Sequence, residues 1–459
     1  MRPMKSSNVV FVHGLMGWGP NDLGGLPYWG DAPAQFSPRF RAHLAKCGPL
    51  NSVHDCACEL FAQIVGARID YGESHSALAG HARFSRDYSG RGFVGNWSAE
   101  NPVILIGHSA GAQTCRMLQN LLAQDFWGVG SNAEWVEAIV GVAGALNGST
   151  LAYRYCDEEH GKLKMLPSAL VAGALSVVSA LSRLGASRLY DLHLDHWARE
   201  EQAGEAFLRR LDATYFIESG DNLGFDVTLH GAARLNQSME TFANCLYLSL
   251  VSSATREGRF LNLPFLRARH RPVRSMELTM RDTAAHIATR PEFSVAPTPD
   301  WGSGDLTMDL WRENDGVVNT ISQRYPFIGR AHPVGGEGIF GFEDRLEPGK
   351  WRYHRLDEMF GMAFDHNDAT HGACMKPLEK GRREVQRELY RRLANVLETF
   401  DTRRDQIGRT SLIGSSLAAR KSGGAQTSAP LFSSVSQRAD HTSKPPSPPP
   451  SSKPPASVS

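Results

Sequence analysis

The sequence of 459 residues has little surplus charge of either sign, because its 49 Lys and Arg residues are balanced by 48 Asp and Glu residues. Proteins that bind nucleic acids usually carry a basic patch and a basic net charge, so the composition predicts no nucleic-acid partner. Cysteine is scarce too, and seven residues exclude a disulfide scaffold in a chain of this length. The odd number leaves at least one thiol unpaired or paired with another chain. We expect buried or unpaired thiols, since Cys56-x-Cys58 lacks zinc-ribbon spacing.

Long apolar runs are also missing. No stretch reaches the roughly 18 uninterrupted apolar residues of a membrane-spanning helix, and the nearest, 169–184, is broken by serines and a glycine. The first eight residues lack the apolar region and cleavage site of a secretory signal. We therefore expect a mature, soluble chain that is able to act at an interface.

Short β-branched runs alternate with helical patterns along most of the sequence, which predicts the α/β class with a mostly parallel sheet. Two of the expected strands are Val9 to His13 and Pro102 to Gly107. Apolar residues at helical spacing predict a last helix over 379–400. The segment 404–459 is rich in Ser and Pro, and its composition predicts a disordered tail.

A nucleophile motif follows the second of these strands. In Gly107-His-Ser-Ala-Gly, small residues flank Ser109 two positions away on both sides, as a tight strand-to-helix elbow requires. An ordinary turn is the alternative interpretation. The backbone N–H of Ala110 would then supply one oxyanion donor, and the His13-Gly14 step would present the Leu15 amide as the second, unless that step is a simple glycine turn.

A serine nucleophile needs a base and an acid that orients the base, in the chain order Ser, Asp or Glu, His on this kind of sheet. Asp315 lies at a turn, and His366 follows it with His371 close behind. Order alone leaves many other histidines and acids open.

Several strings together resemble the zinc-containing thermoalkalophilic lipases of bacilli and, more distantly, the staphylococcal lipases. They are Val12-His-Gly-Leu-Met-Gly-Trp-Gly, Asp70-Tyr-Gly, Gly80-His-Ala-Arg-Phe, Gly107-His-Ser-Ala-Gly, Leu194-Asp-His-Trp, Gly231-Ala-Ala-Arg-Leu-Asn-Gln and Glu313-Asn-Asp-Gly-Val-Val-Asn-Thr. The resemblance covers about residues 8–400. It implies an α/β-hydrolase fold over 1–403 that carries lid helices and a small zinc-binding insertion.

The resemblance further implies that Ser109 is the nucleophile, Asp315 the acid and His366 the base, with Leu15 and Ala110 forming the oxyanion hole. The sequence departs from the family in two places. Gly107 replaces a common Ala, and the segment between Asp315 and His366 is longer and rich in Gly and Pro.

A structural zinc ion is implied as well, bound by Asp55, His75, His81 and Asp221 in an insertion over about 50–90 and 195–230. Two imidazoles and two carboxylates suit tetrahedral zinc, and a site with four protein ligands has no open position for chemistry. Family members also carry calcium near the catalytic histidine. Asp368 is available for it, but Ala369 to Pro377 lacks the second acid, which weakens the expectation of calcium.

An apolar stripe over 169–184 lies where the resembled lipases keep their lid, so the segment 168–190 is either a lid that opens onto lipid or a fixed core helix. The expected function is carboxylester hydrolysis, with triacylglycerol as the favoured substrate at a lipid interface. The alternatives are a phospholipase, a thioesterase or an esterase for soluble esters. A non-catalytic binding protein, whose Pro-rich tail would meet an SH3-like partner, is the third reading. The resembled enzymes are secreted, but no signal is visible, so localisation stays open.

Overall fold

The computed structural model describes residues 7–156, 158–159, 162–163, 190–197, 213–258, 269–289, 308–327, 332–375 and 381–401. The chain separates into two units, Met1–Arg403 and Arg404–Ser459, and every described residue belongs to the first. The predicted tail and the predicted lid helix over 169–184 lie outside the described residues, so both stay predictions.

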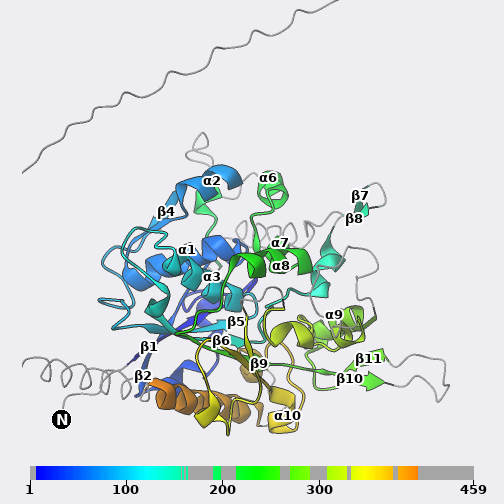
Figure 1. Ribbon diagram of the computed structural model, residues 1–459. Coiled ribbons are helices and arrows are strands. Elements are labelled where there is room, and N and C mark those ends of the chain that lie inside the picture. The colour runs from blue at the N-terminus through cyan, green and yellow to red at the C-terminus, as the bar shows by residue number, and fades with distance from the viewer. Residues whose placement is uncertain are drawn as a thin grey trace, which may run out of the picture. The chain divides into compact units, whose positions relative to one another are not determined.

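A seven-stranded sheet forms the centre of the first unit (Figure 1). Its order is β12 (Val334–Glu337), β13 (Trp351–Arg355), β9 (Leu246–Val251), β6 (Val136–Val142), β5 (Val103–His108), β1 (Ser7–Val12) and β2 (Phe40–Leu44). Every neighbouring pair is parallel. The predicted strands at Val9 and Pro102 thus lie side by side as β1 and β5, with Val10 opposite Leu105.

Helices cover both faces of this sheet, which is why its central strands are apolar on both sides. On one face, α1 (Val53–Val65) and α3 (Gly111–Ala123) pack on Val10, Val103 and Leu105. On the other, a helix over 382–401, orange in Figure 1, packs Leu389 and Leu393 on the alternate residues of the same strands. The helix predicted over 379–400 is therefore present in its described part.

The remaining elements are short. The other helices are α2 (Glu73–Ala79), α6 (Ala213–Glu218), α7 (Leu223–Asp226), α8 (Leu229–Ser238), α9 (Leu278–Thr289), α10 (Leu356–Phe360) and α11 (Gly372–Met375). Three two-stranded sheets pair β3 (Arg68–Asp70) with β4 (Phe84–Asp87), β7 (Glu158–Glu159) with β8 (Lys162–Leu163), and β10 (Thr255–Gly258) with β11 (Arg269–Pro272). Within the described ranges no helix has the length and apolar character needed to cross a bilayer.

Residues of the segment 50–90 contact the segments around residues 196 and 222, beside α1. The strand-like residues Asn51 and Asn222 form an isolated antiparallel bridge, and the backbone N–H of Ala82 donates to the carbonyl of His196 at 2.9 Å. A small apolar cluster that contains Leu50, Trp197 and Phe216 lies beneath these contacts. The two parts predicted as one insertion are thus in contact, while its predicted bounds stay a prediction.

Candidate active site and metal-binding cluster

Ser109 sits at a strained elbow between β5 and α3. Its φ is +56°, a left-handed value that is uncommon for a residue with a side chain. A Cβ on Gly107 would lie 2.4 Å from the carbonyl oxygen of Gly111, and one on Gly111 would lie 2.4 Å from that of Val12. Both flanking glycines are therefore needed for close backbone contact, and the elbow interpretation explains them where an ordinary turn does not.

The loop after β1 approaches the elbow closely. A Cβ on Gly14 would lie 2.6 Å from Cβ of Ser109 and 3.1 Å from the amide nitrogen of Ala110. Leu15, the next residue, lines the same cavity as Ser109, and Ala110 immediately precedes the N-terminus of α3. The predicted donor residues are thus brought together around the serine, at a helix end that favours negative charge.

His366 and Asp315, 51 residues apart in the chain, form a buried pair. Nδ1 of His366 lies 2.9 Å from Oδ2 of Asp315, and the backbone N–H of His366 donates to the carbonyl of Asp315 at 3.0 Å. Asp315 is fully buried and His366 nearly so. The structure therefore brings together the two residues that the sequence predicted as acid and base.

Three further donors hold the Asp315 carboxylate in place. Oδ1 accepts the N–H groups of Val317 at 3.0 Å and Val318 at 2.7 Å, and Oδ2 accepts the side-chain amide of Gln323 at 3.0 Å. These bonds fix the orientation of the carboxylate toward the imidazole. Sequence reasoning missed Gln323, whose only signal was its place eight residues after the candidate acid.

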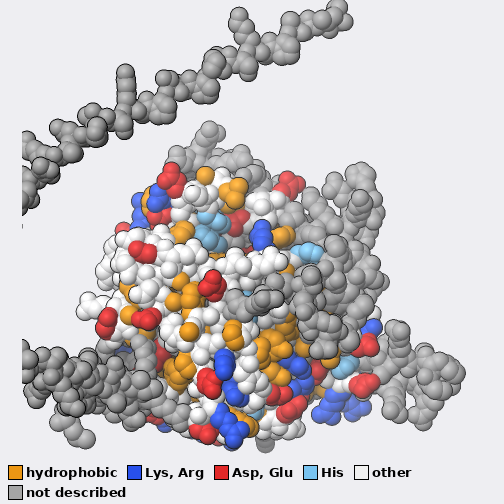
Figure 2. All heavy atoms as spheres, in the orientation of Figure 1, with side chains coloured by type: hydrophobic (Ala, Val, Ile, Leu, Met, Phe, Trp, Pro, Cys, Tyr) orange, Lys and Arg blue, Asp and Glu red, His pale blue; other side chains and the backbone are white. Residues whose placement is uncertain are grey.

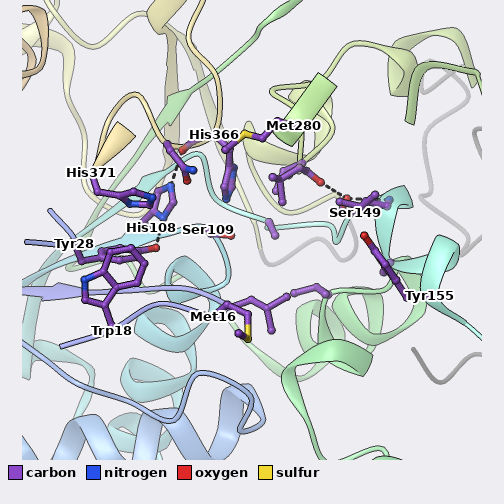
Figure 3. A pocket seen from close by; sticks show the side chains of 18 residues that line it. Met16, Trp18, Tyr28, His108, Ser109, Ser149, Tyr155, Met280, His366 and His371 are labelled. Carbon is purple, nitrogen blue, oxygen red and sulfur yellow. Dashed lines mark hydrogen bonds between the residues drawn. The ribbon is translucent and has the colours of Figure 1, made fainter. Parts of the chain in front are cut away.

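Ser109 and His366 open into one largely apolar cavity of about 310 Å³ (Figure 3). The imidazole of His366 points toward Ser109, and Met16, Tyr155 and Met280 also line the cavity. His371, the second histidine of the same loop, also lines the cavity, and its ring lies 4.8 Å from that of Trp18. Asp315 pairs with His366 and not with His371, so the geometry favours His366 over His371 as the candidate base.

The four predicted metal ligands also come together. One ligand atom from each of Asp55, His75, His81 and Asp221 can be chosen so that all lie within 4.8 Å of one another, and this cluster could hold a metal ion. Asp55 lies in α1, His75 in α2, His81 just after α2 and Asp221 before α7. Figure 2 shows histidine side chains reaching the surface beside α1 and α2.

Two polar atoms of this cluster fit a bound cation. Nε2 of His81 and Oδ2 of Asp221 are buried and make no well-aligned hydrogen bond, although they face each other at 3.3 Å. Burial alone would raise the pKa of Asp55, but hydrogen bonds from His196, His54 and His75 hold it well below its usual value. Against the effect of burial, the adjacent carboxylates of Asp221 and Asp55 raise the pKa of His75 to about 10.

His196 is a neighbour that the sequence prediction did not assign. Its Nε2 lies 3.1 Å from Oδ2 of Asp55, and the residue is buried. It belongs to the string Leu194-Asp-His-Trp, so the resemblance contained a signal for it. This hydrogen bond would orient the Asp55 carboxylate toward a metal ion bound in the cluster.

The acid considered for calcium has a cation of its own. Asp368 forms a buried ion pair with Arg382 at the start of the helix over 382–401, and its Oδ2 also accepts the backbone N–H of Asp365 at 2.8 Å. Calcium binding through Asp368 therefore gains no support from this geometry and stays a hypothesis.

Comparisons with known proteins relate the chain to bacterial lipases. A family model described as "Lipase-like, C-terminal domain" matches residues 5–139. The lipase of Staphylococcus hyicus is 28% identical over 353 residues, which cover 71% of this chain and 49% of the relative. Lipase 2 of Staphylococcus aureus is 28% identical over 358 residues, covering 71% and 46%. The chain thus spans about half the length of the curated relatives it matches.

Solved structures agree with the sequence matches. The crystal structure of the Staphylococcus hyicus lipase superposes with a TM-score of 0.66 and 25% identity, covering 87% of this chain and 97% of the other. The structure of EstA from Clostridium botulinum gives a TM-score of 0.65 and 26% identity, covering 86% and 88%. The predicted fold is therefore confirmed, and its central sheet is parallel throughout in the described residues.

Proposed function

Because this chain is a relative of the staphylococcal lipases on the α/β-hydrolase fold, as its sequence indicated, we propose that it hydrolyses carboxylic esters through a Ser109-His366-Asp315 triad. One observation carries the proposal. Ser109, held at a positive φ, opens into the same cavity as a histidine that is paired with a buried carboxylate. A serine, a base and an orienting acid are the parts that acyl transfer needs.

In the first half of the reaction, Oγ of Ser109 attacks the ester carbonyl and Nε2 of His366 accepts the hydroxyl proton. Asp315 accepts a hydrogen bond from Nδ1 of His366, which selects the tautomer with a free Nε2 and stabilises the imidazolium. The amides of Leu15 and Ala110 donate to the oxyanion. His366 then gives its proton to the departing alcohol, and Ser109 carries the acyl group.

In the second half, His366 takes a proton from water, and the water oxygen attacks the acyl carbonyl. The same two amides stabilise the second oxyanion. As this intermediate collapses, His366 returns its proton to the departing Oγ of Ser109, which restores the serine and releases the carboxylic acid. Removing one oxyanion donor typically costs about 100-fold to 1,000-fold in kcat.

The substrate we favour is an acylglycerol with an apolar chain. The cavity wall is built largely from hydrophobic side chains, among them Leu15, Met16 and Met280. Such a wall lowers the free energy of an acyl chain by removing it from water, at roughly 25 cal/mol per Å². Phospholipids, thioesters and smaller esters share the reacting group and are the competing substrates.

We also propose that Asp55, His75, His81 and Asp221 hold a zinc ion. Nε2 of His81 and Oδ2 of Asp221, which are buried without a well-aligned hydrogen bond, support this choice, and borderline nitrogen with hard oxygen ligands suits zinc. When bound, the ion supplies a structural crosslink, since four protein ligands leave no position for substrate. No step of ester hydrolysis passes through it.

The test is hydrolysis of p-nitrophenyl esters with acyl chains from two to sixteen carbons, by the wild type and by Ser109→Ala. We expect long-chain activity that falls by about 1,000-fold or more in Ser109→Ala. The control is Ser98→Ala, which changes a surface serine that bonds only locally to Glu100. A p-nitrophenyl phosphonate should label wild type once, at Ser109. Absence of hydrolysis and of labelling in the folded wild type would refute the proposal.

A further inference from the structure

A buried histidine adjoins the nucleophile without belonging to the triad. His108 is 1% exposed and has two polar neighbours, both drawn in Figure 3. Its Nε2 lies 2.9 Å from the backbone carbonyl oxygen of His366, and its Nδ1 lies 2.6 Å from the hydroxyl of Tyr28. The first contact joins residues that are 258 positions apart in the chain.

The chemistry of the partners fixes the direction of both bonds. A carbonyl oxygen only accepts, so Nε2 of His108 must carry the proton and donate to His366. Burial lowers the pKa of His108 well below its usual value, so the ring is neutral and Nδ1 accepts. The hydroxyl of Tyr28 therefore donates to Nδ1, and its oxygen is left to accept the N–H of Gly14 at 3.4 Å.

The result is a directed hydrogen-bond chain from Gly14 through Tyr28 and His108 to the backbone of His366. Gly14 belongs to the loop that contacts Ser109, and His108 is covalently joined to Ser109. The chain thus connects the proposed oxyanion loop, the nucleophile elbow and the base.

This connection completes the restraint of His366. Its N–H donates to the carbonyl of Asp315, its Nδ1 pairs with the Asp315 carboxylate, and its carbonyl accepts from His108. Nε2, the atom that must exchange protons with Ser109, is the remaining polar atom of the residue. A misplacement of about 1 Å can cost 100-fold in rate, so each restraint on this ring bears on catalysis.

We propose that His108 and Tyr28 are positioning residues, which hold the base and the oxyanion loop in register with Ser109 through this hydrogen-bond chain. The inference rests on the proposed ester hydrolysis. It predicts that the hydrogen bond from His108 to His366 affects the catalytic rate by positioning His366, in addition to any contribution to folding stability.

Two conservative variants separate the two bonds of His108. The side-chain amide of Asn reaches the position of Nδ1, so His108→Asn keeps an acceptor for Tyr28 and loses the donor to His366. The longer Gln reaches the position of Nε2, so His108→Gln keeps that donor. Tyr28→Phe removes the hydroxyl and keeps an aromatic ring against Trp18 and Trp29.

The matched control is His332, which makes the same two kinds of bond outside the described lining of the cavity. Its Nδ1 lies 2.9 Å from the hydroxyl of Thr241, and its Nε2 lies 3.1 Å from the carbonyl of Asn236. Burial lowers the pKa of His332 to about 4, so this ring is neutral too. His332→Asn therefore reports what the loss of such a bond does to folding alone.

Rates are measured per Ser109 titrated with a p-nitrophenyl phosphonate, together with Tm and the pH profile of kcat/KM. We expect His108→Asn to lower kcat by about 10-fold to 100-fold with KM within about threefold, and to move the acidic limb of the profile to lower pH as His366 loosens from Asp315. His108→Gln should restore kcat to within about threefold of wild type, and Tyr28→Phe should lie between the two.

Equal losses in His108→Asn and His108→Gln with an unmoved pH profile, or an unchanged kcat in His108→Asn, would overturn the positioning role. A loss of kcat per titrated site in His332→Asn as large as that in His108→Asn would do the same. A wild type that neither hydrolyses esters nor reacts with the phosphonate would instead refute the proposed function, so the two failures are distinguishable.

Discussion

At the scale of single residues, Gly14 shows how closely the loop after β1, which carries the proposed oxyanion donor Leu15, meets the elbow. A Cβ at this position would lie 2.6 Å from Cβ of Ser109 and 2.8 Å from the carbonyl oxygen of His108. We therefore expect Gly14→Ala to displace the loop and lower kcat/KM by about 100-fold or more, because the Leu15 amide leaves the oxyanion. Overpacking of this kind costs about 1–3 kcal/mol of folding free energy.

The control for Gly14→Ala is Gly95→Ala. Gly95 is exposed, and a Cβ there has no atom within 4 Å. The rate of ester hydrolysis and the Tm of Gly95→Ala should equal those of the wild type. If both alanine variants hydrolyse p-nitrophenyl butyrate at the wild-type rate, the close approach of the loop has no bearing on the reaction.

The site residues that the sequence predicted are those with local motifs around them. Ser109 lies between two spaced glycines, and the string that contains Asp315 matches a family, whereas His366 was predicted from chain order and from what the resemblance implies. The structure brings this acid and this histidine together, although their roles stay proposals. The contacts of His108, Tyr28 and Gln323 were not predicted. His108 and Tyr28 contact residues that are distant in sequence, and Gln323 belongs to no motif, so spacing along the chain does not reveal these contacts.

At the scale of elements, the loop that bears His366 is tied to the helix over 382–401 by one buried ion pair. Arg382 and Asp368 are 5% and 3% exposed, and Nη1 of Arg382 also donates to the carbonyl of Ala363 at 3.2 Å. Arg382→Met leaves a buried carboxylate without this guanidinium. We expect a loss of about 3–5 kcal/mol in the free energy of unfolding, measured by urea denaturation.

Two further variants check that the charge is responsible. Arg382→Met combined with Asp368→Asn should be more stable than Arg382→Met alone, because the buried negative charge is removed together with the guanidinium. Arg383→Met, which changes the neighbouring and mostly exposed arginine, should cost no more than about 1 kcal/mol. Equal destabilisation by Arg382→Met and Arg383→Met would contradict the role of the buried pair.

Elements with strong periodic patterns were predicted within a few residues. The strand expected at Val9–His13 is observed at Ser7–Val12, and the one at Pro102–Gly107 at Val103–His108. The apolar residues of these two strands face helices on both sides of the sheet. Burial of their side chains is therefore enough to specify the strands. The segment 50–90 is different, because its short helices and strands are organised by contacts with residues near 196 and 222, which no local pattern reveals.

At the scale of the whole molecule, the metal-binding cluster joins parts of the chain that are far apart in sequence. Asp55 and Asp221 are separated by more than a third of the chain, and the ion pairs of His75 and His81 with both carboxylates connect them. Repulsion between the buried carboxylate of Asp55 and the partly buried carboxylate of Asp221 opposes this contact, and a divalent cation between them would remove that repulsion. The proposed zinc ion should therefore act on the stability of the first unit as a whole.

We expect one zinc per chain by elemental analysis, and a fall in Tm after dialysis against a chelator that is reversed by adding zinc. A ligand at 1,000 times its Kd stabilises the folded state by about 4 kcal/mol, which sets the scale of the fall. His81→Ala should lose the zinc and reproduce the low Tm, whereas His43→Ala should retain it, because His43 bonds to Asn8 on the neighbouring strand.

Initial ester hydrolysis at 25 °C should survive chelation, because no ligand lies among the described residues that line the cavity. Immediate loss of hydrolysis with the fold intact would make the metal catalytic, and an unchanged Tm would remove its structural role.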